Sequence, residues 1–66
     1  MNLKNDFTVT FKLTNGETVK VKPAPMETPN GAIRQALIQF DLLGQWDTAQ
    51  VSCPGLGFWG PIVTEL

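Results

Sequence analysis

The sequence predicts a small α+β domain in the order ββαββ, with a mainly antiparallel four-stranded sheet and one helix packed on one face of it. Three observations support this class. Apolar and polar residues alternate along two segments before position 22, helical periodicity follows position 28, and alternation returns after position 47. With 66 residues the chain has room for one domain, spanning 1–66.

The first two strands are expected to form a hairpin from Phe7 to Val21 that turns at Asn15 and Gly16. In both segments the odd positions from 7 to 21 are mostly apolar and the even positions are threonine or lysine, which is typical of strands buried on one side. Pro23 and Pro25 end the second strand, because proline cannot donate a backbone hydrogen bond to a neighbouring strand.

The loop between these strands is expected to hold three residues. A two-residue turn at Asn15-Gly16 would be the common choice, but it would set Phe11 opposite Lys20 and mix lysines with apolar side chains. A loop over 14–16, with Gly16 in the left-handed conformation of a bulge, keeps the apolar side chains together. The apolar pairs in this register are Phe11 with Val19 and Val9 with Val21.

A helix is expected to begin after Thr28, which is a suitable N-cap, with Pro29 at the first helical position. Gly31 weakens the first turn, so the regular helix is expected to begin at Pro29 or within the few residues after it. The expected end is near Gly44, a suitable C-terminal cap. One apolar stripe along this helix consists of Ala32, Ile33, Ala36, Leu37, Phe40 and Leu43.

The third strand is expected at 48–53, where apolar and polar residues alternate again. Glycines and prolines then predict a loop over 54–61, and the β-branched residues after it predict a short last strand at 62–66. This order of elements resembles the β-grasp folds of ubiquitin-like proteins. That resemblance implies a mixed sheet with the last strand parallel to the first, and we favour the antiparallel alternative.

The chain lacks the residues on which most catalytic and metal sites depend. It has no histidine and no tyrosine, and its six carboxylates do not have the spacing of a calcium loop. One cysteine without histidine cannot build a zinc site, and it excludes an intramolecular disulfide. Cys53 lies on the apolar side of its strand and is expected to be a buried structural residue. We therefore predict a non-enzyme with no cofactor, metal or small-molecule substrate.

Composition also narrows the expected partners and location. The formal net charge of -1 provides no broad positive field for nucleic acid. No apolar run approaches the ~20 residues of a membrane span or the ~7 to 15 of a signal-peptide core. We expect a soluble, cytoplasmic protein that does not contact membranes.

The segment 54–61 holds the first candidate interface, formed by Leu56, Phe58 and Trp59. Adjacent aromatic residues are costly to expose to water and are common anchors at protein interfaces. In an extended segment neighbouring side chains point to opposite sides. We expect one of the two aromatic residues to fill the core and the other to be available to a partner protein.

A second candidate surface consists of Ile38 and Leu42, one helical turn apart on the side away from the apolar stripe, with Trp46 beside them. If the helix continues to Leu43, these residues form an exposed apolar patch. If it ends near Asp41, positions 42 and 43 turn into the core. The sequence is compatible with both.

A third candidate surface is the polar side of the first two strands, which carries Lys12, Lys20 and Lys22. No aromatic residue alternates with these lysines to stack on bases. Lysine and threonine are also usual on a solvent-facing sheet or a protected edge. Nucleic-acid binding through this face is therefore the weakest hypothesis.

The leading functional hypothesis is a small protein-binding module, such as an inhibitor or adaptor that occludes a partner's surface. Compact free-standing chains of this size are common among phage and mobile-element accessory proteins, which makes such an origin a further hypothesis. The alternative is a structural subunit that uses the same apolar surface to form a homodimer.

Overall fold

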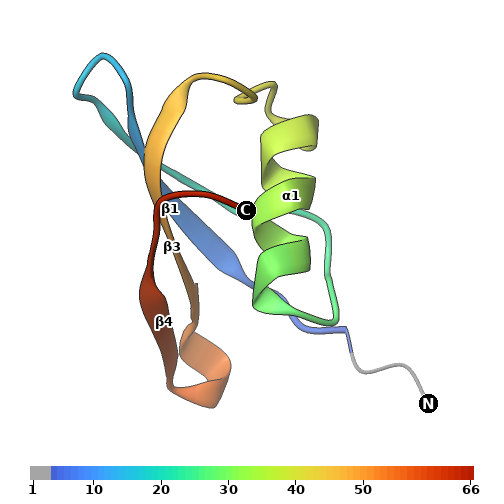
Figure 1. Cartoon of the computed structure of the whole chain (residues 1–66). Coiled ribbons are helices and arrows are strands. Elements are labelled where there is room, and N and C mark those ends of the chain that lie inside the picture. The colour runs from blue at the N-terminus through green and yellow to red at the C-terminus, as the bar shows by residue number, and fades with distance from the viewer. Residues whose placement is uncertain (1–3) are drawn as a thin grey trace.

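The computed structural model describes residues 4–66. Two strands, β1 (Thr8–Leu13) and β2 (Thr18–Val21), precede the helix α1 (Pro29–Gln39). After it come β3 (Trp46–Cys53), the short 3-10 helix η1 (Pro54–Leu56) and β4 (Phe58–Val63). The strands form one sheet in the order β2-β1-β3-β4, and α1 lies along one side of this sheet (Figure 1).

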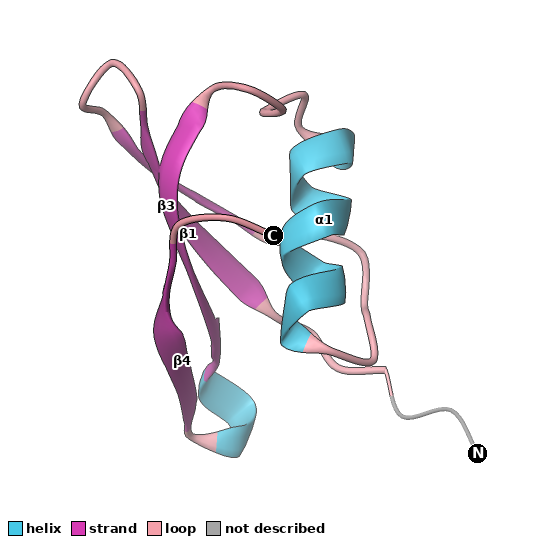
Figure 2. Ribbon diagram, in the orientation of Figure 1, coloured by secondary structure: helices cyan, strands magenta, loops and turns pink. Residues whose placement is uncertain are grey.

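All strand pairs are antiparallel, so the predicted ββαββ architecture is confirmed. The mixed β-grasp alternative is wrong, because β1 lies between β2 and β3 and pairs with both of them antiparallel, whereas β4 lies at the far edge beside β3. Figure 2 shows the resulting two layers, with the helix on one side and the four strands on the other.

The first hairpin has the predicted three-residue loop. The Gly16 N–H donates to the Leu13 carbonyl over 3.0 Å, and the Leu13 N–H donates to the Glu17 carbonyl over 2.7 Å. Gly16 has a φ of 89°, in the left-handed region that glycine adopts without steric cost. The register pairs Phe11 with Val19 and Val9 with Val21, as predicted.

The core lies between α1 and the covered side of the sheet. Its buried apolar members are Phe7, Val9, Phe11, Leu13, Ala32, Ile33, Ala36, Leu37, Ala49, Val51 and Cys53. Two edge-to-face aromatic contacts close it, Phe7 with Phe58 at 6.5 Å between ring centroids and Phe11 with Trp46 at 6.0 Å. Ten of the eleven core positions are in β1, α1 and β3, and Phe7 directly precedes β1, so the two central strands and the helix carry the packing.

The helix begins where the sequence predicts. Thr28 has extended backbone angles, and its hydroxyl accepts a hydrogen bond of 3.0 Å from the Gly31 N–H, with Pro29 at the first helical position. A Cβ on Gly31 would lie only 3.2 Å from the Met26 Cε. The absence of that atom lets the methionine side chain approach the first turn.

Of the two helix ends that the sequence left open, the structure has the earlier one, because α1 stops at Gln39, close to Asp41, and not near Gly44. Asp41 has a φ of 56°, the Leu42 N–H donates to the Leu37 carbonyl over 2.8 Å, and the Asp41 N–H donates to the Ile38 carbonyl over 3.4 Å. This is a Schellman motif with aspartate in the position that glycine usually occupies. The chain therefore turns at Asp41, three residues before Gly44, the first glycine after the helix.

This early end changes the burial of the predicted apolar stripe. Its first four residues, Ala32, Ile33, Ala36 and Leu37, are buried as predicted. Phe40 is exposed, and Leu43 is 63% exposed in the turn before Gly44. Leu42 takes their place against the core.

The C-terminal half also differs from the prediction in its boundaries. β3 begins at Trp46, two residues early, and β4 spans Phe58–Val63 where a loop over 54–61 and a strand over 62–66 were expected. Gly60 and Pro61 are tolerated inside β4 because it is an edge strand with an irregular register. Within the described residues, no helix has the length and apolar character to cross a bilayer.

Candidate protein-binding face

One side of the sheet is not covered by α1, and we call it the open face. Residues that alternate with the core positions along each strand belong to it. They are Thr8, Thr10, Lys12, Thr18, Lys20, Thr48, Gln50, Ser52, Trp59 and Ile62. Antiparallel sheets commonly leave one face to solvent, and such a face is usually polar. The β4 end of this face departs from that rule.

Trp59 and Ile62 are the apolar residues of the open face. Trp59 pairs with Ser52, and Ile62 pairs with Gln50. Ser52 and Gln50 are two positions apart in β3, so their side chains share a side of the sheet, and so do those of their partners. Trp59 is 67% exposed and Ile62 is 60% exposed. The two side chains thus form an apolar strip along the edge strand.

A β-bulge explains how residues three apart in sequence share a face. The register shifts between Gln50 and Ser52, which leaves both Gly60 and Pro61 opposite the single residue Val51. The Gln50 side chain donates from Nε2 to the Gly60 carbonyl over 3.0 Å and so supports the bulge. In a regular strand, residues three apart such as Trp59 and Ile62 would point to opposite sides of the sheet. Because the bulge adds one residue between them, both point to the same side.

The neighbouring Phe58 points the other way, into the core, where its ring meets Phe7. One of the two adjacent aromatic residues is therefore internal and the other external, as the sequence predicts for an extended segment. Both belong to β4 and not to a loop. Leu56 precedes them in η1 and is 68% exposed.

The second candidate surface is not a single patch. Ile38 is 67% exposed on α1, but Leu42 and Trp46 are half-buried and pack against the core. The Schellman turn at the end of α1 brings Leu42 inward, and the contact with Phe11 holds Trp46. Of the three predicted residues, only Ile38 is left on the surface as a large exposed side chain.

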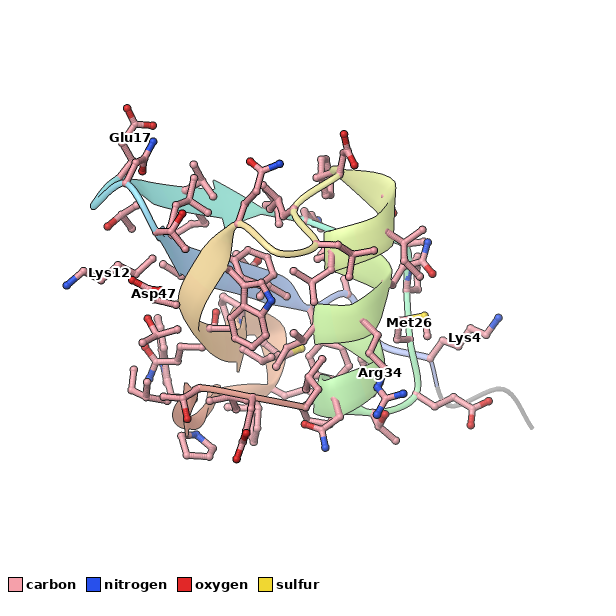
Figure 3. All side chains as sticks on the ribbon, turned by 45° about the horizontal axis from the view of Figure 1, so that its top comes forward. Lys4, Lys12, Glu17, Met26, Arg34 and Asp47 are labelled. Atoms are coloured by element: carbon pink, nitrogen blue, oxygen red, sulfur yellow. The ribbon has the colours of Figure 1, made fainter. Side chains whose placement is uncertain are left out.

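The lysines lie at the other end of the open face. Lys12 is in β1, where Figure 3 shows it pointing away from α1, and Lys20 is in β2. Lys20, Thr10, Gln50 and Ile62 form one cross-strand row. Three strand spacings separate its ends, roughly 14 Å. Trp59 shares the face with the lysines but is not interleaved with them.

A groove at the end of the sheet connects Leu56 to the open face. It has a volume of about 450 Å³ and is lined by Asp6, Thr8, Lys22, Cys53, Pro54, Gly55 and Leu56. Thr8 belongs to the row that continues through Ser52 to Trp59. Leu56 therefore lies at the margin of the surface that Trp59 and Ile62 form.

Cys53 forms part of the wall of this groove, but it is 5% exposed, in agreement with the predicted buried cysteine. Its thiol donates to the Asp6 carbonyl over 3.5 Å. In the described residues 4–66, no three His, Cys, Asp or Glu side chains gather as a metal site would require.

Ile62 is the member of this surface that sequence reasoning missed. The glycines and prolines of 54–61 predicted a loop there, so Ile62 was expected to begin a separate strand. A glycine followed by proline between β-branched and aromatic residues is also the pattern of a bulged edge strand, and that signal could have identified it.

The chain was compared with models of protein families, with curated proteins and with solved structures, and no match was found in any of these comparisons.

Proposed function

We propose that this chain is a non-enzymatic protein-binding module that docks through the β4 end of its open face. The observation that carries the proposal is the 67% exposure of Trp59 on a side of the sheet that α1 does not cover. Tryptophan is among the residues most enriched at the energetic centres of protein interfaces. Ile62 beside it and Leu56 at the margin enlarge the apolar area.

The physical reason is the free energy of apolar surface in water. Each buried Å² of such surface contributes about 25 cal/mol, and an edge tryptophan with an adjacent isoleucine offers a substantial area to a complementary surface. The indole ring would enter an apolar depression of the partner, and the polar residues of β3 and β1 would form the rim of the contact.

Binding of this kind would act by covering part of the partner's surface. A partner whose functional surface accepts the indole would lose access to its own ligand, so the chain would act as an inhibitor. A partner bound elsewhere would be tethered, so the chain would act as an adaptor. Neither role requires a reacting group on this chain.

The test is affinity capture from the native host with three forms of the chain. The wild type is compared with Trp59→Ala and with Ile38→Ala, since Ile38 has the same 67% exposure but lies on α1. Extracts are treated with nuclease so that nucleic acid cannot bridge the proteins. We expect Trp59→Ala to lose a protein that the wild type and Ile38→Ala retain.

Identical sets of captured proteins for all three forms would refute the proposal, as would a loss confined to Ile38→Ala. Light scattering of the purified chain distinguishes the homodimer. A dimer that becomes monomeric in Trp59→Ala would mean that a second copy is the partner of this surface.

A further inference from the structure

The two edges of the sheet are protected to different extents. β4 at one edge contains Pro61, which has no N–H, and a bulge that interrupts its register. Both features hinder the addition of another strand. β2 at the other edge pairs with β1 in an unbroken register from Thr18 to Val21. Lys20 protects this edge against neutral or basic strands, but the regular backbone can accept a strand whose charge complements the lysine.

The phase of the hydrogen bonds shows which groups β2 presents. The Leu13 N–H bonds to Glu17, and hydrogen-bonded pairs recur at every second residue of an antiparallel ladder. Val19 and Val21 therefore bond to β1. The N–H and C=O groups of Thr18 and Lys20 point outward, away from the sheet.

The side chains of β2 differ on its two sides. Val19 and Val21 pack against the core but are only half-buried. Part of the apolar surface of the core is therefore exposed at this edge. Lys20 is exposed on the open face, and Lys22 follows with the same parity beside Thr8. Lys12 on the adjacent strand adds a third positive charge to the same side.

We propose that the β2 edge binds an extended acidic segment of another protein as a fifth strand of the sheet. Its backbone would bond to the outward groups of Thr18 and Lys20. Its apolar side chains would continue the core beyond Val19 and Val21, and its carboxylates would stand beside Lys20 and Lys22, since opposed residues of neighbouring strands share a face.

The same lysines disfavour a second copy of the chain at this edge. Pairing two β2 strands about a two-fold axis would bring the Lys20 side chains of both copies to the same side, where like charges repel. The charge of the edge therefore selects an acidic strand. This inference concerns a different edge from the one that carries Trp59 and does not depend on the proposed function.

The test uses two heptapeptides, one in which valine alternates with glutamate and one in which valine alternates with lysine. Binding is followed by the hydrogen-exchange rate of each backbone amide in the wild-type chain. We expect only the glutamate peptide to bind and to slow exchange at Thr18 and Lys20. The same peptide with N-methyl groups on alternate amides should not bind, because it cannot complete the ladder.

Charge reversal provides matched controls. The double variant Lys20→Glu with Lys22→Glu should weaken binding of the glutamate peptide by about tenfold or more. Arg34→Glu, an exposed charge on α1, should change it less than twofold, and so should Trp59→Ala. Equal binding of both peptides, binding of neither, or slowed exchange away from β2 would overturn the proposal.

Discussion

Trp59 and Ile62 stand side by side on the open face although three positions separate them in β4, because Gly60 and Pro61 lie together opposite Val51. The bulge thus places two large apolar side chains on the side of the sheet that has no helix. It also takes part in protecting the β4 edge. One local irregularity produces both the surface proposed for binding and the resistance of this edge to strand addition.

Gln50 should stabilise this bulge measurably. Gln50→Met keeps the length of the side chain and removes the Nε2 donor to the Gly60 carbonyl. We expect a loss of about 1 kcal/mol in the free energy of unfolding, measured by urea denaturation. Thr48→Val, on the same strand and face, serves as the control and should change stability by less than about 0.5 kcal/mol. A loss as large in the control would show that the hydrogen bond is not the cause.

Trp46 and Trp59 should differ in their contribution to stability and in the solvent exposure of their rings. Trp46→Ala removes a ring packed against Phe11 and should lower the unfolding free energy by about 2 kcal/mol, whereas Trp59→Ala should change it by about 0.5 kcal/mol or less. Fluorescence provides a second check with the phenylalanine variants. Trp59→Phe leaves only Trp46, which packs against the core, whereas Trp46→Phe leaves only the exposed Trp59. The tryptophan emission should therefore be at shorter wavelength and less quenched by iodide in Trp59→Phe than in Trp46→Phe. The reverse order would contradict the orientation of Phe58 and Trp59.

The hairpin loop should require glycine at one position. Gly16→Ala forces a residue with Cβ to a φ of 89° and should destabilise the chain by roughly 1 kcal/mol or more. That corresponds to a fall in Tm of about 4–8 °C for a domain of this size. Gly55→Ala is the matched control, since no atom lies within 4 Å of the added Cβ. Equal melting temperatures for the two variants would disprove the bulged loop.

The end of α1 offers a stabilising substitution. Asp41 has a φ of 56° and carries a negative charge at the C-terminal end of the helix, where the dipole disfavours it. Asp41→Gly should raise the unfolding free energy by about 0.5–1 kcal/mol, as measured by thermal denaturation. Asp47→Gly, in strand β3, should lower it, because glycine gives up more conformational freedom there. A destabilised Asp41→Gly would mean that the aspartate side chain itself holds the turn.

The parts of the fold that were predictable have strong local signals. Alternation of side chains determined the hairpin register through Phe11 and Val19, and Thr28 followed by Pro29 marked the helix start. The helix end was left open between Asp41 and Gly44, because aspartate, not glycine, adopts the left-handed conformation at position 41. The packing of Leu42 on the core favours the earlier turn, and this tertiary contact is not visible in the local sequence.

The candidate surface was predictable only in part. The opposite directions of Phe58 and Trp59 follow from strand geometry, so an exposed aromatic residue was foreseeable. The role of Ile62 depends on a bulge that forms only when β4 pairs with β3, a tertiary interaction that the local sequence does not contain. The exposed state of Trp59 depends equally on which side of the sheet α1 covers.

Site-specific photocrosslinking in the native host tests the central claim most directly. A photoreactive amino acid is placed at position 62 or, as the control, at position 38, which is exposed on α1. We predict that position 62 crosslinks to a foreign protein, that the product disappears when Trp59→Ala is added, and that position 38 gives no such product. A crosslink from position 38 alone, or from position 62 only to a second copy of this chain, would contradict the account.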